Sequence, residues 1–135
     1  MSSFLFKTEP SEYSYADLAR DRRAVWDGVS NPLALIHLRQ VRKGYTVVIY
    51  HTGAEKSAVG LAVAASNPYP DPRLDDPKRV AVDLKPVRAL PKPVPLGTFK
   101  TDPLLRTVEL VRIPRLSVMP LSAAQLKRLL QHAEA

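Results

Sequence analysis

Thirteen prolines interrupt the 135 residues of this chain and restrict the structures that it can form. Proline has no backbone N–H and a fixed φ, so it breaks both helices and the hydrogen-bond ladders between strands. Most of the prolines fall in residues 67–72, 75–77 and 91–95. We predict that these segments are irregular connections between short strands, and that residues 91–95 cross the surface without continuing a ladder.

Five segments have the hydrophobic patterns of short strands, with β-branched residues or with apolar residues at alternate positions. Two of them are separated only by a short polar loop, which predicts a hairpin. The five predicted strands are residues 3–7, 46–51, 58–65, 80–84 and 110–116, the last interrupted by Pro114.

Three segments carry the signals of helix starts. Each has a Ser or Asn at the N-cap position, and two add the acidic or Gln residue of a capping box three positions later. We predict helices over residues 14–22, over residues 32–40, and from residue 122 onward. Five or six short strands, three helices and no strict β-α-β alternation favour an α+β fold, a small curled sheet or barrel with flanking helices. Residues 1–135 show no composition break and predict a single domain.

The charge of the chain indicates a polyanionic partner. Lys and Arg number 20 against 13 Asp and Glu, a formal net charge of +7. A surface with this excess attracts nucleic acid, although a basic surface that only aids solubility is the alternative. The absence of cysteine excludes disulfides and predicts an intracellular, cytoplasmic location. Apolar runs are too short to span a membrane, and no signal peptide is recognisable, so we expect no membrane association.

The sequence offers little for metal or cofactor chemistry. The three histidines, at positions 37, 51 and 132, have no ligand spacing, and the acidic loop 71–76 has no calcium-loop pattern. Glycine-rich phosphate loops are missing, and Ser117 has no glycine elbow around it. We therefore expect no metal, no cofactor and no enzymatic activity.

The only tryptophan, Trp26, lies among turn-forming residues rather than in an apolar periodic segment. Other polar side chains fall at the ends of predicted elements, and each has an ordinary structural interpretation as a core, cap or turn residue. Together they supply an aromatic face, carboxylate and amide groups for a base edge, and a cation for phosphate. Base stacking on an aromatic ring contributes roughly 1–3 kcal/mol. The set is Lys7, Thr8, Glu9, Trp26, Asp27, Asn31, Tyr50 and His51.

Several short motifs, taken in order, resemble those of an EVE domain along nearly the whole chain. They are Phe6–Pro10 (FKTEP), Val25–Asn31 (VWDGVSN), Tyr50–Thr52 (YHT), Val59–Gly60, Tyr69–Asp71 (YPD) and Arg115–Val118 (RLSV). EVE domains belong to the PUA-like superfamily, so the resemblance implies a small β-barrel with flanking helices. The chain is similar, more distantly, to YTH domains, which read methylated adenine in RNA.

Known EVE domains are regarded as readers of modified bases, particularly modified cytosine in DNA, and some are proposed to act on RNA. The resemblance therefore implies a nucleic-acid-binding module that flips such a base into an aromatic pocket. In this pocket Trp26 forms one wall, Lys7, Thr8 and Glu9 approach from the first strand, and Asp27 and Asn31 fix the loop. Tyr50 and His51, with Arg115 and Ser117 from the late strand, are expected at its rim or floor.

Three alternatives stay open at the level of sequence. One is an RNA-binding PUA-like module. Another is an enzyme on a modified nucleoside, with Glu9 or Asp27 as general base. The third is a module for a small molecule or a protein partner. The sequence does not determine the oligomeric state.

The chain also departs from the family pattern. Ser30 stands where the family commonly has arginine, Tyr45 where it has aspartate, and Thr52 where it has serine. The apolar residues 32–35 replace a polar and basic start of the second helix. These differences bear on which ligand is bound and how tightly.

Overall fold

The computed structural model describes residues 2–135. Within them the strands are β1 Ser3–Thr8, β2 Ala24–Trp26, β3 Thr46–His51, β4 Ser57–Ala64, β5 Tyr69–Pro70, β6 Val80–Pro95 and β7 Val118–Leu121. The helices are α1 Tyr15–Asp21, α2 Pro32–Leu38, α3 Leu96–Thr101, the 3₁₀ helix η1 Leu105–Thr107, α4 Glu109–Arg112 and α5 Ala123–Glu134.

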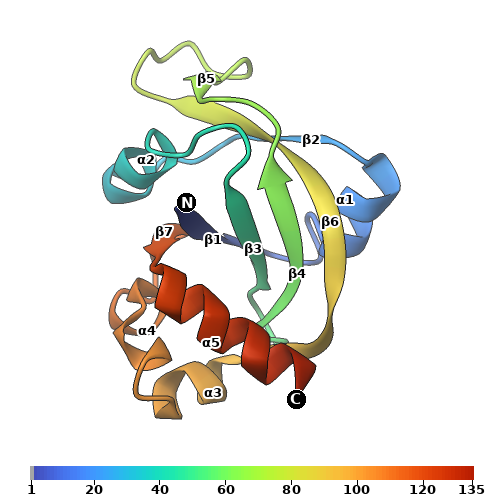
Figure 1. Ribbon diagram of the computed structural model, residues 1–135. Coiled ribbons are helices and arrows are strands. Elements are labelled where there is room, and N and C mark those ends of the chain that lie inside the picture. Colours follow the sequence, from blue (N-terminus) through green and yellow to red (C-terminus); the bar gives the residue numbers. More distant parts are fainter. Residues whose placement is uncertain (1) are drawn as a thin grey trace.

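Six strands form one curled sheet in the order β2-β6-β4-β3-β1-β7, and β5 pairs with β6 beside this path (Figure 1). All pairs are antiparallel except β1 and β3, which run parallel from Ser3 opposite Thr46 to Thr8 opposite His51. A parallel pair requires a long crossover connection. Here residues 9–45 make that crossover and contain α1, β2 and α2.

The core lies inside the curl of the sheet and includes fully buried Phe6, Leu38 and Ile49. Helix α5 packs against β6 and buries Leu129 and Ala133 (Figure 1). Helix α2 contacts both β6 and β7 and so lies between distant strands of the curl. The predicted PUA-like α+β arrangement, a small curled sheet with flanking helices, is confirmed.

The predicted helix starts are confirmed by their cap hydrogen bonds. Ser14 and Ser122 each form a complete capping box, and the Asn31 side chain accepts a hydrogen bond from the Ala34 amide at 3.0 Å. Such caps satisfy backbone donors that have no partner inside the helix. Helix α2 ends at Leu38, two residues before the predicted end.

The prediction that residues 91–95 leave the sheet was wrong, because β6 continues to Pro95. The pairing of β4 with β6 changes register here, from Gly60 opposite Ala89 to Ala58 opposite Val94. Residues 90–93 therefore have no partner in β4, and two of the prolines fall in this stretch. Because proline has no amide hydrogen to donate, it is tolerated where the ladder is interrupted.

The prediction of a strand over residues 110–116 was also wrong. Its first part is helix α4, and its last part is a turn that precedes β7. Short apolar runs do not distinguish a buried strand from a short buried helix. Helix α3 and strands β2, β5 and β7 were not predicted, and Trp26 lies at the end of a short strand rather than in a loop.

A close approach between α1 and β4 depends on glycine. A Cβ atom placed on Gly60 would lie 2.4 Å from the ring of Tyr15. That ring is buried, and its hydroxyl donates a hydrogen bond to the Leu61 carbonyl oxygen at 2.6 Å. The ring is held in place at both ends and has little freedom to move away.

We predict that Gly60→Ala lowers the free energy of unfolding by about 1–3 kcal/mol, because the added methyl group overpacks against Tyr15. Urea denaturation followed by circular dichroism would measure the loss. Gly97→Ala is the matched control, since no atom lies within 4 Å of its added Cβ. Equal stability of the two variants would contradict the prediction.

Asp102 connects α5 to the segment that follows α3. Its Oδ1 atom accepts hydrogen bonds from the Leu104 and Leu105 amides at 2.9 and 3.2 Å. Its Oδ2 atom accepts from His132 at 2.7 Å and from Arg128 at 3.2 Å. The hydrogen bond from His132 and those from the backbone hold the pKa of the Asp102 carboxyl well below its usual range.

We predict that Asp102→Asn lowers the free energy of unfolding by about 1–3 kcal/mol at pH 7, since Arg128 and His132 lose a buried carboxylate acceptor. A lowered pKa stabilises the fold only while the unfolded carboxyl, with a pKa of about 3.9, is ionised. The difference from wild type should therefore shrink as the pH falls below about 4.

Urea denaturation at pH 7 and pH 3 measures both effects, and the exposed Asp75→Asn serves as the control. If Asp102→Asn and wild type differed in free energy of unfolding by the same amount at both pH values, the lowered pKa of Asp102 would be contradicted.

Candidate functional site

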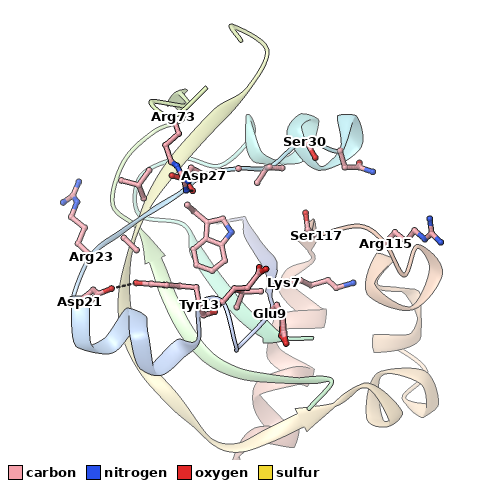
Figure 2. Close-up of a pocket in the computed structure, with 18 residues that line it drawn as sticks. Lys7, Glu9, Tyr13, Asp21, Arg23, Asp27, Ser30, Arg73, Arg115 and Ser117 are labelled. Atoms are coloured by element: carbon pink, nitrogen blue, oxygen red, sulfur yellow. Dashed lines mark hydrogen bonds and ion pairs between the residues drawn. The ribbon is translucent and has the colours of Figure 1, made fainter. Parts of the chain in front are cut away.

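A cleft of about 840 Å³ opens along the crossover connection, between the end of β1, strand β2 with its following loop, and the turn before β7 (Figure 2). Figure 2 shows Tyr13 and Asp21 at one end and Ser117 and Arg115 at the other. Eight of the ten predicted site residues line it: Lys7, Thr8, Glu9, Trp26, Asp27, Asn31, Arg115 and Ser117.

The indole of Trp26 is half-buried in one wall of the cleft. Its ring centroid lies 5.9 Å from that of Phe6, a core residue, and 6.1 Å from that of Tyr13 in an edge-on arrangement. Strand pairing fixes the backbone, because Trp26 lies opposite Val82 of β6. The tryptophan therefore serves the core on one side and the cleft on the other.

Tyr13, which is not among the predicted site residues, supports this wall. Its hydroxyl donates a hydrogen bond to Asp21 Oδ2 at 2.9 Å, and its carbonyl oxygen accepts one from the Thr8 hydroxyl at 2.6 Å. Burial, followed by the contact with Asp21, raises the pKa of the Tyr13 hydroxyl to about 12. The phenol thus stays protonated at neutral pH and continues to donate.

Asp71 anchors the loop that follows Trp26. Its Oδ2 atom accepts the Gly28 amide at 2.9 Å, and its Oδ1 atom accepts the Arg73 amide at 2.9 Å. The Asp71 residue is only 2% exposed. The Arg79 guanidinium donates to the Val29 carbonyl oxygen at 3.0 Å and provides a second link to the same loop. Gly28 has φ +74°, a conformation that favours glycine.

The basic side chains of the cleft differ in how far they are already paired. Arg23 is bound to Asp83 at 2.7 Å, and Arg73 lies 3.7 Å from Asp27. The Lys7 ammonium donates to the Pro114 carbonyl oxygen at 2.6 Å, and burial lowers its pKa. Arg115 forms no ion pair with any residue of 2–135 and is exposed.

Glu9 carries an unsatisfied acceptor. Its Oε1 atom accepts a hydrogen bond from the Ser11 hydroxyl at 3.2 Å. Its Oε2 atom is buried and has no hydrogen-bond partner within residues 2–135. The carboxylate lies beside Gly53, where an added Cβ atom would be 3.2 Å from Oε1 and 3.5 Å from Oε2. A buried oxygen without a donor is costly, so this carboxylate is held in place at the expense of a hydrogen bond.

Two predicted site residues lie outside the cleft. The His51 side chain is buried, with Nε2 accepting the Tyr15 amide at 3.0 Å and Nδ1 2.9 Å from Glu55 Oε2. This pattern assigns the proton to Nδ1 and occupies both ring nitrogens. Tyr50 is 2% exposed and packs edge-on against Phe99. Arg115 does line the cleft, but from a turn rather than from the predicted strand.

Six lining residues were not predicted as site residues: Glu12, Tyr13, Asp21, Arg23, Ser30 and Arg73. Only Arg73 comes from a distant part of the chain, and the other five lie between positions 9 and 31. The YPD motif does contain the anchor Asp71, but nothing in its spacing indicates a contact with Gly28.

Over residues 2–135 there is no helix both long and apolar enough to cross a membrane. The same residues bring no three side chains of His, Cys, Asp or Glu together in a group that could hold a metal ion. The acidic side chains in the cleft come instead from separate parts of its wall.

Comparison with known proteins shows similarity to one protein family. The family model of the EVE domain matches residues 2–132 of the chain. Thymocyte nuclear protein 1 from chicken is 28% identical to this chain over an alignment of 153 positions, and the alignment covers 88% of this chain. The match covers 63% of the chicken protein and 69% of its human counterpart, so this chain spans about two thirds of these relatives.

Solved structures share the whole fold. A protein from Rhodopseudomonas palustris has a TM-score of 0.93 at 32% identity, over 99% of this chain and 94% of that one. Human THYN1 protein in complex with 5-methylcytosine-containing DNA has a TM-score of 0.91 at 27% identity. That match covers 100% of this chain and 99% of the human one.

We predict that Asp71→Asn loosens the loop after Trp26. An amide side chain of the same shape has only one acceptor oxygen, so one of the Gly28 and Arg73 amides loses its partner. Hydrogen exchange should become faster by about tenfold at the Gly28 amide or the Arg73 amide, whichever loses its acceptor, while the buried Val48 amide in β3 is unaffected. Equal acceleration at the Val48 amide would indicate a global effect, and no change in the exposed Asp75→Asn variant is the control.

Proposed function

The chain belongs to the EVE domain family, and from this we propose that it is a non-enzymatic, nucleic-acid-binding module that reads a modified base, modified cytosine in DNA. The observation that carries the proposal is the half-buried indole of Trp26 on the wall of a cleft of about 840 Å³. The complex of the human relative with 5-methylcytosine-containing DNA supports the same ligand class.

Stacking on Trp26 would provide the main contact to the base. A ring held by Phe6 and Tyr13 does not have to be ordered when the ligand arrives, so little side-chain entropy is lost. Stacking contributes roughly 1–3 kcal/mol per base. That offsets much of the few kcal/mol needed to take a base out of a duplex.

Polar groups of the cleft would recognise the edge of the flipped base. Glu9 lines the cleft and is the candidate acceptor for the exocyclic amine of cytosine, once its carboxylate turns toward the base. The side-chain oxygen of Asn31 is already used by the helix cap, which leaves its amide hydrogens for an acceptor on the base. Asp27 would act mainly by holding the cleft wall.

Cationic groups would bind the backbone. Lys7 and Arg115 lie at the same end of the cleft, and the net charge of +7 adds a general attraction to phosphate. Ser30 lines the cleft where the family commonly has arginine, and Arg73 from the loop after β5 lines the same cleft. We infer that Arg73 takes over the role of the absent arginine.

The proposal extends to two points that rest on sequence. A cytoplasmic location remains our expectation from the absence of cysteine. We also propose RNA as a partner in addition to DNA, since the polar and aromatic groups of the cleft suit a base of either.

The experiment is a titration of Trp26 fluorescence, the only indole signal of the chain, with short DNA and RNA oligonucleotides that carry cytosine or 5-methylcytosine. We expect 5-methylcytosine DNA to quench the emission at lower concentration than the unmodified oligonucleotide. In a binding assay with labelled DNA, Trp26→Ala should weaken affinity about 5- to 100-fold through lost stacking. Added salt should also weaken the binding.

Ile36→Ala, an exposed position on α2 that does not line the cleft, is the control for surface changes. If no oligonucleotide alters the emission and Trp26→Ala lowers only the melting temperature, the indole serves the core alone. Mass spectrometry of the recovered oligonucleotide tests the enzymatic alternative, which predicts a chemically altered base.

A further inference from the structure

A second hollow of about 310 Å³ lies beside the cleft and shares one residue with it, Lys7. Its walls combine apolar side chains with the hydroxyl-bearing Tyr50 and with Lys56. The apolar part is made by Leu96, Leu110 and Pro114. We call this space the Tyr50 hollow.

Tyr50 contributes a hydroxyl to the lining of the hollow. The residue is 2% exposed and lies opposite Lys7 in the parallel β1–β3 pair. The hydrogen bonds among residues 2–135 include none to its hydroxyl, and burial alone raises its pKa to about 12. The hydroxyl thus lines the hollow without a protein partner among the described residues and is free to donate to a ligand there.

Two ammonium groups border the same space. Lys7 spans the boundary between cleft and hollow, with its Nζ atom 2.6 Å from the Pro114 carbonyl oxygen. Lys56 forms no ion pair with any described residue, and its side chain is exposed. Its backbone has φ +44°, which is uncommon for a residue other than glycine. The Leu96 amide fixes this conformation by donating to the Lys56 carbonyl oxygen at 2.8 Å.

We infer that the Tyr50 hollow binds the nucleotide next to the one read in the cleft, with its phosphate on Lys56 and the Tyr50 hydroxyl and its sugar against Leu96 and Leu110. The inference rests on the proposed function. Two cations and a hydroxyl match a phosphate diester, and the apolar wall matches the carbon face of a sugar. The shared Lys7 places the hollow beside the cleft, where the adjoining residue of a strand lies.

The test compares Lys56→Gln and Tyr50→Phe with wild type. Tyr50→Phe removes only the hydroxyl and retains the packing against Phe99. The probes are 5-methyldeoxycytidine nucleoside and a single-stranded hexamer with one 5-methylcytosine. Both variants should bind the hexamer about tenfold more weakly and the nucleoside as tightly as wild type. Lys92→Gln, an exposed lysine on β6, is the matched control and should change hexamer affinity less than twofold.

Neutral methylphosphonate linkages, placed one at a time along the hexamer, identify the phosphate. When the neutral linkage is at one position adjacent to the modified base, Lys56→Gln and wild type should bind the hexamer with the same affinity. The inference would be overturned if the variants lost affinity equally for the nucleoside and the hexamer, or lost affinity for neither. It would also be overturned if Lys56→Gln weakened binding to the same extent whichever linkage is neutral. If wild type binds the modified hexamer normally and only these differences are absent, the proposed function survives. If wild type binds neither probe, both fail.

Discussion

The parallel pairing of β1 with β3 determines where the candidate site can lie. Strands that run in the same direction cannot be joined by a tight turn, so the chain must leave the sheet and return. In this protein the returning segment, residues 9–45, carries α1, the Trp26 strand and α2. The cleft forms between this segment and the end of β1, which means that one topological requirement brings most of the lining residues together.

Elements with local signals were predictable from the sequence. The caps at Ser14, Asn31 and Ser122 depend on residues within a few positions, and all three helices begin where expected. Strand β2 depends instead on distant residues of β6, and its three residues have no strand pattern of their own. Strand β6 runs through Pro91 because its ladder is interrupted there, which no local rule for proline foresees.

The residues of the candidate site likewise fall into those that the sequence predicts and those that only the fold brings to the cleft. The family-like motifs contain Trp26 and Glu9, so these residues could be selected without a structure. Tyr13 and Arg73 required the fold, because they reach the cleft from different loops. Tyr50 is the converse case. Its place at a strand end predicted that it would line the cleft, whereas the structure places it in the lining of the neighbouring hollow, opposite Lys7 in the parallel pair.

The prolines of β6 also bear on strand pairing between two copies of the molecule. Along residues 85–95, the side of this long strand away from β4 has no strand partner among residues 2–135. Such an edge commonly recruits the edge of a second molecule and starts aggregation. Pro86, Pro91, Pro93 and Pro95 remove amide donors from this stretch. These positions offer no amide hydrogen to a strand of a second molecule, so this edge is a poorer template for pairing than its length alone suggests.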